Sequence, residues 1–122
     1  MKNLLILIAE DDEVFEIFLS TAVQKFGKEI IKVKTGIDAV EVCCNNPDID
    51  LVLMDIKMPE MDGYEAIRQI RLINPNIVII VQTAFVLNDE RENAFAAGCD
   101  EYIIKPYSKS ELQSLIEKKF KM

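Results

Sequence analysis

The sequence contains no histidine and no tryptophan, and it has only three cysteines. Without histidine the chain cannot build a Ser-His-Asp or Cys-His relay or an HExxH zinc site, and it cannot carry a phosphohistidine itself. The cysteines show neither CxxC nor zinc-ligand spacing, and the adjacent Cys43 and Cys44 would close a disulfide only with strain. We therefore expect three reduced thiols, with Cys43 or Cys44 acting as a small apolar core residue.

Positive charge is also scarce, because 14 Lys and Arg stand against 21 Asp and Glu, a net charge of −7. Direct nucleic-acid binding normally needs a basic surface. The apolar run Leu4–Ala9 is shorter than the ~7–15 residues of a signal-peptide core and leads straight into acidic residues, and no segment approaches the ~18 apolar residues of a membrane span. At ~100–200 residues per domain, residues 1–122 form one domain. These features predict a cytoplasmic domain that contacts neither nucleic acid directly nor a membrane.

Short apolar runs alternate along the chain with segments of helical periodicity. Most runs are continuously apolar, as is typical of parallel strands covered on both faces. They are Leu4–Ala9, Ile30–Val33, Leu51–Met54, Ile77–Val81 and Tyr102–Ile104. The lysines in and around the second run indicate an edge strand. Five strands alternating with five helices, joined by right-handed crossovers, predict a doubly wound α/β fold.

The helices are expected to have recognisable ends. Gly27 supplies a stop for a first helix that extends to Phe26, and Gly98 is a candidate C-cap for a helix over about 88–97. Ser108 and Glu111 form a capping box at the start of the last helix. The remaining two helices are expected over 37–44 and 64–71.

Polar residues follow four of the five predicted strands. They are Glu10-Asp11-Asp12, Asp55, Thr83 and Lys105. The carboxyl ends of parallel strands meet at one edge of the sheet, where ligands bind. At ~4 Å and an effective dielectric constant near 20, each pair of carboxylates repels by about 4 kcal/mol, so this edge needs a neutralising group. Hard oxygen ligands without histidine favour Mg²⁺ or Mn²⁺.

This group of residues suits phosphoryl transfer to Asp55. A metal ion and Lys105 can neutralise the phosphoryl oxygens, Thr83 can donate to one of them, and Asp55 can attack in line. Plainer interpretations exist for each residue: an acidic helix start, a solvated lysine, or a threonine at a strand end. Asp55 weighs against them, since a carboxylate that ends a buried strand needs a partner or a task.

Along nearly its whole length the chain resembles a receiver domain of two-component response regulators, and it is most similar to the receivers of hybrid sensor histidine kinases. Glu10-Asp11 stands where the family often has Asp-Asp. The matching stretches are residues 6–11, 53–63, 82–84, 97–99 and 102–107. The resemblance implies a flavodoxin-like five-stranded parallel sheet in the order 2-1-3-4-5 with five helices.

The resemblance also implies residue roles. Asp55 is then the phosphoacceptor, and it receives its phosphoryl group from a phosphohistidine on a histidine kinase or a histidine phosphotransfer protein. Asp11 and Asp55 bind Mg²⁺ directly, the Lys57 backbone carbonyl is a third ligand, and Glu10 acts through water. Thr83 and Lys105 contact the phosphoryl oxygens. Tyr102 is the aromatic switch that changes the surface of the last helices and strands.

The resemblance leaves the parent protein open. A hybrid histidine kinase is favoured over a stand-alone, monomeric or weakly dimeric regulator. The domain itself catalyses only its own aspartyl phosphorylation and dephosphorylation. In this family the positions of Lys57 and Phe85 flank the path of the hydrolytic water, and neither side chain orients a water, which predicts slow dephosphorylation.

Three other classes compete with the receiver interpretation. A flavodoxin-like nucleotide binder needs a glycine-rich phosphate loop where this chain has acidic residues. An aspartyl-phosphate hydrolase of the haloacid dehalogenase kind needs a second acid where this chain has Lys57. A metal-free interaction module with a decayed site is the third.

Overall fold

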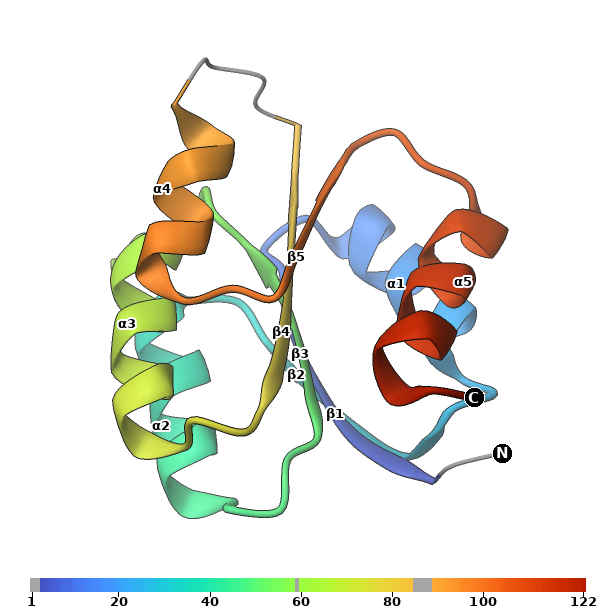
Figure 1. Cartoon of the computed structure of the whole chain (residues 1–122), viewed down its shortest axis with the longest axis horizontal. Helices are drawn as coiled ribbons and strands as arrows, with labels where there is room; N and C mark the ends of the chain where they lie inside the picture. The colour runs from blue at the N-terminus through green and yellow to red at the C-terminus, as the bar shows by residue number, and fades with distance from the viewer. Residues whose placement is uncertain (1–2, 59, 85–88) are drawn as a thin grey trace.

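Strands and helices alternate strictly in the computed structural model, which describes residues 3–58, 60–84 and 89–122 (Figure 1). The elements are β1 (Leu4–Ala9), α1 (Glu13–Val23), β2 (Gly27–Val33), α2 (Gly36–Asn45), β3 (Leu51–Asp55), α3 (Gly63–Ile73), β4 (Val78–Thr83), α4 (Glu90–Ala97), β5 (Glu101–Ile104) and α5 (Lys109–Phe120).

The strands form one parallel sheet in the order β2-β1-β3-β4-β5. Helices α1 and α5 cover one face, and α2, α3 and α4 cover the other (Figure 1). This arrangement confirms the predicted α/β fold, its strand order and the position of β2 at an edge. Because all strands are parallel, their carboxyl ends lie along the same edge of the sheet.

A hydrophobic core lies on each face of the sheet. Every residue of β1 and β3 is buried, as expected for central strands with helices on both sides. One core joins the sheet to α2, α3 and α4, and the other joins it to α1 and α5. Of the adjacent pair, Cys43 lies in the core and Cys44 is exposed, and all three cysteines are free, as predicted.

The boundary between α1 and β2 differs from the prediction. Helix α1 ends at Val23, and Gly27 is the first residue of β2 rather than the stop of the helix. Phe26 is buried in the core, and its carbonyl accepts a hydrogen bond from the Leu4 amide at 2.7 Å. This contact with β1 turns the chain into the sheet before a further helical turn can form.

The other helix ends follow the sequence signals. Gly98 has a φ of 121° and donates its amide to carbonyls in α4, and Ser108 with Glu111 forms the predicted capping box of α5. Gly63 opens α3 directly beside β3. A Cβ there would lie 2.7 Å from the Asp55 carbonyl oxygen, so a side chain would displace the loop that follows Asp55.

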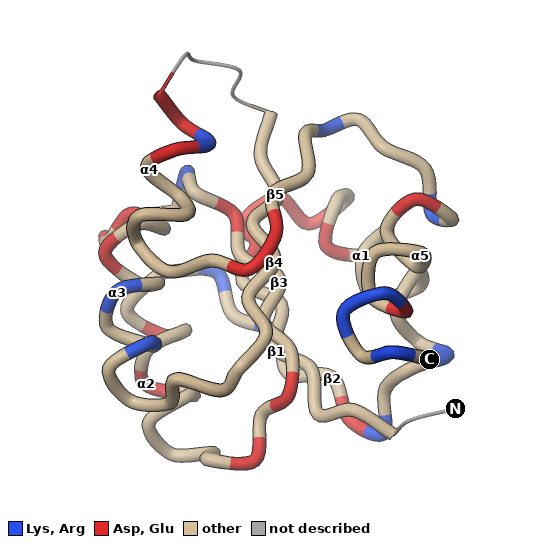
Figure 2. Tube along the Cα trace, in the orientation of Figure 1, with Lys and Arg blue, Asp and Glu red and all other residues tan. Residues whose placement is uncertain are grey.

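Charge is unevenly distributed over the fold (Figure 2). Basic residues gather in the last turn of α5, whereas the start of α1, which follows β1, is acidic. Within the described ranges, none of the helices is long and apolar enough to cross a membrane.

Candidate functional site

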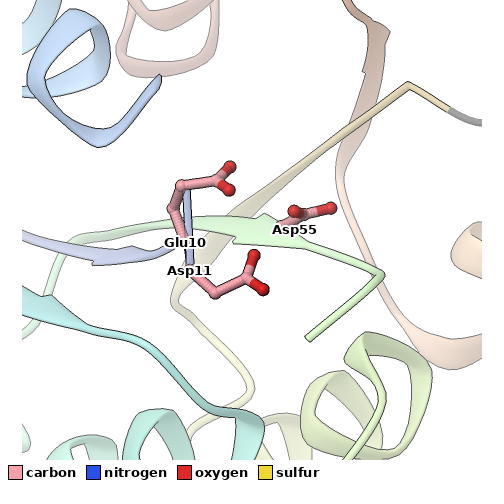
Figure 3. Close-up of side chains that lie close together, drawn as sticks. All are labelled: Glu10, Asp11 and Asp55. Atoms are coloured by element: carbon pink, nitrogen blue, oxygen red, sulfur yellow. The ribbon is translucent and has the colours of Figure 1, made fainter. Parts of the chain in front are cut away.

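Three carboxylates converge where β1 and β3 end (Figure 3). Glu10, Asp11 and Asp55 each offer one oxygen, and these oxygens lie within 4.8 Å of one another. Glu10 and Asp55 are buried, and Asp11 is exposed. Asp12, the remaining member of the acidic run, instead caps α1 by accepting hydrogen bonds from the Val14 and Phe15 amides.

Lys105 reaches this cluster from the chain just after β5. Its Nζ donates to Glu10 Oε1 at 2.9 Å and lies 3.6 Å from Asp55 Oδ2. The ammonium also lies 4.1 Å from the centre of the Phe15 ring, a cation–π contact. Because only 16% of its side chain is exposed, Lys105 is not a solvated strand-end lysine. The structure thus brings together the cation and the carboxylates that the sequence placed at this edge.

A second donor contacts the same oxygen of Glu10. The fully buried Gln82 donates its Nε2 to Glu10 Oε1 at 2.9 Å, and Tyr107 donates its hydroxyl to Gln82 Oε1 at 3.3 Å. Sequence reasoning missed both residues as members of the site. The available signal was a glutamine at the end of the apolar β4 run, because a buried amide needs hydrogen-bond partners.

The electrostatics of the cluster favour a bound cation. Burial, and then the nearby Glu10 carboxylate, raise the pKa of Asp55 to about 6, although Lys105 and the Lys57 amide act in the opposite direction. That amide donates to Asp55 Oδ1 at 3.2 Å. Lys105 pairs with Glu10 and Asp55, and Asp11 adds a third carboxylate, so these four described side chains carry negative charge in excess. An all-oxygen set with this excess suits Mg²⁺, which prefers a few carboxylates together with water.

Thr83 ends β4, one residue after the position that pairs with Asp55, and is fully buried. Its carbonyl accepts a hydrogen bond from the Lys105 amide at 2.8 Å, which fixes the chain after β5 against β4. Tyr102 lies on β5 opposite Val81 and is buried. The Lys57 side chain is exposed. Phe85 lies outside the described residues.

Comparison with known families identifies the family to which this fold belongs. The response regulator receiver domain family matches residues 6–117. The chain belongs to this family. The receiver domain is similar to hybrid signal transduction histidine kinase L of Dictyostelium discoideum, with 32% identity over 120 residues, 93% of this chain and 7% of that protein. It is 33% identical over 108 residues to the transcriptional regulatory protein ZraR of Klebsiella oxytoca, 88% of this chain and 24% of that protein.

A solved relative holds a metal. The receiver domain of sensor histidine kinase PA1611 from Pseudomonas aeruginosa, with magnesium coordinated in its active site cleft, shares 33% identity and a TM-score of 0.86. The match covers 95% of this chain and 96% of that one. The receiver domain spans 7% and 24% of the two curated relatives, which are much longer proteins. Family and fold are therefore as predicted from the sequence.

Proposed function

We propose that this receiver domain accepts a phosphoryl group on Asp55 in a reaction that depends on Mg²⁺. One observation carries the proposal: the Lys105 ammonium and the Asp11 carboxylate both lie at the buried Asp55 carboxylate. A carboxylate is a poor nucleophile toward an anionic phosphoryl group unless cations offset the repulsion between them.

Each residue of the site has a defined task in the transfer. An Asp55 carboxylate oxygen attacks the phosphorus, the bond from phosphorus to the donor's histidine nitrogen breaks, and its electron pair leaves with the imidazole. Lys105 donates to an oxygen of the incoming group, and the Thr83 hydroxyl donates to another. Asp11, Asp55 and the Lys57 carbonyl would hold the Mg²⁺, and Glu10 would act through water. When bound, the ion neutralises developing charge on the phosphoryl oxygens.

The exposed apolar face of α1 supports a protein as the phosphoryl donor. Val14 and Ile17 are 78% and 61% exposed, and they lie in the first two turns after the acidic cluster. We infer that a histidine kinase or histidine phosphotransfer protein packs against this face when it presents its phosphohistidine to Asp55.

This donor surface can be tested apart from the chemistry. Ile17→Lys should slow transfer from a phosphorylated histidine phosphotransfer protein and leave transfer from phosphoramidate, a small phosphoryl donor with an N–P bond, unchanged. Leu72→Lys is the matched control, because Leu72 is 86% exposed on α3. Equal slowing by both variants, or no slowing by either, contradicts a docking role for α1.

We further propose that residues 1–122 are one domain of a hybrid histidine kinase, in which phosphorylation of Asp55 changes the surface near β4, β5 and the last helices. The identity to hybrid signal transduction histidine kinase L supports this parent protein. A stand-alone regulator is the alternative, and the open reading frame of the parent gene decides between them.

The reaction itself is tested with a small donor. The protein is incubated with acetyl phosphate in the presence of Mg²⁺, and intact mass reports the addition of one acid-stable, base-labile phosphoryl group. Chelation of the metal should stop the reaction. Isothermal titration with Mg²⁺ is the companion measurement. A protein that neither binds Mg²⁺ nor gains the group is a metal-free interaction module with a decayed site.

A further inference from the structure

A buried chain of hydrogen bonds runs behind the phosphoacceptor site. It starts at the Tyr107 hydroxyl, passes through the Gln82 amide to Glu10 Oε1, and reaches Lys105 Nζ. Lys105 in turn lies 3.6 Å from Asp55 Oδ2. These hydrogen bonds join side chains from the residue after β1, from β4 and from the segment after β5, so they connect the interior of the fold to the group that reacts.

The charge on Glu10 sets the direction of every bond in this chain. A carboxylate can only accept hydrogen bonds, so the amide nitrogen of Gln82 must face Glu10. The Gln82 carbonyl oxygen then faces Tyr107, and because that oxygen can only accept, the Tyr107 hydroxyl must donate. Tyr107 therefore satisfies the amide oxygen and stabilises the orientation in which the amide nitrogen donates to Glu10.

Two donors share one oxygen of Glu10, since Gln82 and Lys105 both approach Oε1 at 2.9 Å. If Lys105 were the sole donor to this buried oxygen, the ammonium would be drawn fully toward Glu10, because an unsatisfied buried carboxylate oxygen is costly. Because Gln82 supplies one hydrogen bond to Glu10, the Lys105 ammonium can also stay within ion-pair distance of Asp55.

We propose that Gln82, oriented by Tyr107, is a positioning residue for Lys105 in the phosphorylation of Asp55. The inference rests on the proposed function and adds two residues to it. The Gln82 side chain bonds to Glu10 and Tyr107, and it acts by sharing Glu10 with Lys105.

Aromatic packing keeps the far end of the chain in place. The Tyr107 ring meets the rings of Phe15 and Phe18 at centroid distances of 5.7 and 5.8 Å, both edge-on. Phe15 also lies under the Lys105 ammonium. Because the rings persist when only the hydroxyl is removed, Tyr107→Phe isolates the hydrogen bond from the packing.

Four variants test the proposal. Gln82→Met keeps the length of the side chain without its polar atoms, Tyr107→Phe removes one hydroxyl, and the double variant combines the two. Gln113→Met is the matched control, since Gln113 Nε2 donates to the Ala22 carbonyl at 2.8 Å, between α5 and α1. The binding readout is the affinity for trifluoroberyllate, a phosphoryl mimic, with Mg²⁺ present. The rate of phosphorylation by acetyl phosphate and the melting temperature are measured alongside.

Gln82→Met should weaken trifluoroberyllate binding about tenfold and slow phosphorylation to a similar degree, which is the size of one hydrogen bond to a charged group. Tyr107→Phe alone should lower the trifluoroberyllate affinity and the phosphorylation rate about threefold. In the Gln82→Met background it should lower neither any further, because Tyr107 acts only through the Gln82 amide. Gln113→Met should match the wild type in affinity and rate.

The proposal is overturned if Gln82→Met binds and reacts like the wild type, or if the Tyr107→Phe effect persists in the double variant. Should Gln82→Met fail to fold, Tyr107→Phe decides alone. In Tyr107→Phe, a shifted NMR resonance of the Gln82 side-chain amide together with weaker trifluoroberyllate binding supports the proposal. Wild-type values of both the resonance and the affinity overturn it. If the wild type itself binds no trifluoroberyllate and gains no phosphoryl group, the proposed function fails, which is a different result from a normal wild type with unaffected variants.

Discussion

Lys105→Ala is the substitution whose effect the structure specifies most closely. The ammonium lies 3.6 Å from Asp55 Oδ2 and 2.9 Å from Glu10 Oε1, with 16% of the side chain exposed. At an effective dielectric constant of about 20, a charge pair at the longer distance is worth about 5 kcal/mol. This attraction belongs to the resting protein, and only the additional attraction of the ammonium for the phosphoryl oxygens accelerates the transfer. The loss in the transition state should therefore be nearer 3–4 kcal/mol, which corresponds to about 10²- to 10³-fold in rate.

The assay follows the gain of one phosphoryl group by intact mass after addition of acetyl phosphate and saturating Mg²⁺. Lys25→Ala is the control, because Lys25 forms an ion pair with Glu117 at 3.7 Å in which both side chains are 44% exposed. Such an exposed pair contributes ~0–1 kcal/mol to stability. It joins the turn after α1 to α5 and lies away from the site. A rate for Lys105→Ala equal to that of Lys25→Ala would refute the electrostatic role of Lys105.

Three further predictions concern other parts of the domain. Thr83→Ala should still be phosphorylated but should lose the phosphorylation-induced chemical shifts around Tyr102, so wild-type shifts in that variant contradict the switch. A thiol reagent at pH 8 should label only Cys44. The other two thiols are buried, and burial is the main cause that raises the pKa of Cys43 to about 11 and that of Cys99 to about 12, so little reactive thiolate is present at either. The phosphorylated protein should lose its phosphate over a time on the order of hours, and a Lys57→Asn/Phe85→Glu double variant should lose it faster; release within seconds by the wild type argues against the roles of these two positions.

The fold was predictable because its signals are local and strong. Continuous apolar runs identified central parallel strands, and the lysines around Ile30–Val33 identified an edge. The predicted end of α1 was wrong, because a glycine such as Gly27 is a typical signal for the end of a helix. The deciding contact, from the Leu4 amide to the Phe26 carbonyl, joins residues far apart in the chain.

The candidate site divides in the same way. Glu10, Asp11, Asp55 and Lys105 could be found because charged residues at strand ends stand out against apolar runs. A glutamine at the end of an apolar run indicates a buried amide that needs a partner, but the partners of Gln82 could not be predicted, because they belong to a side-chain network across three parts of the chain. Such a network has no spacing in sequence that marks it.

The location of the phosphoryl group tests the central claim most directly. The protein is phosphorylated with acetyl phosphate and Mg²⁺, the acyl phosphate is reduced with borohydride, and the modified residue is identified by peptide mass spectrometry. We predict that the reduced residue is Asp55 and that Asp55→Asn takes up no phosphoryl group under the same conditions. A phosphoryl group found on another residue, or an undiminished mass gain in Asp55→Asn, would contradict the account.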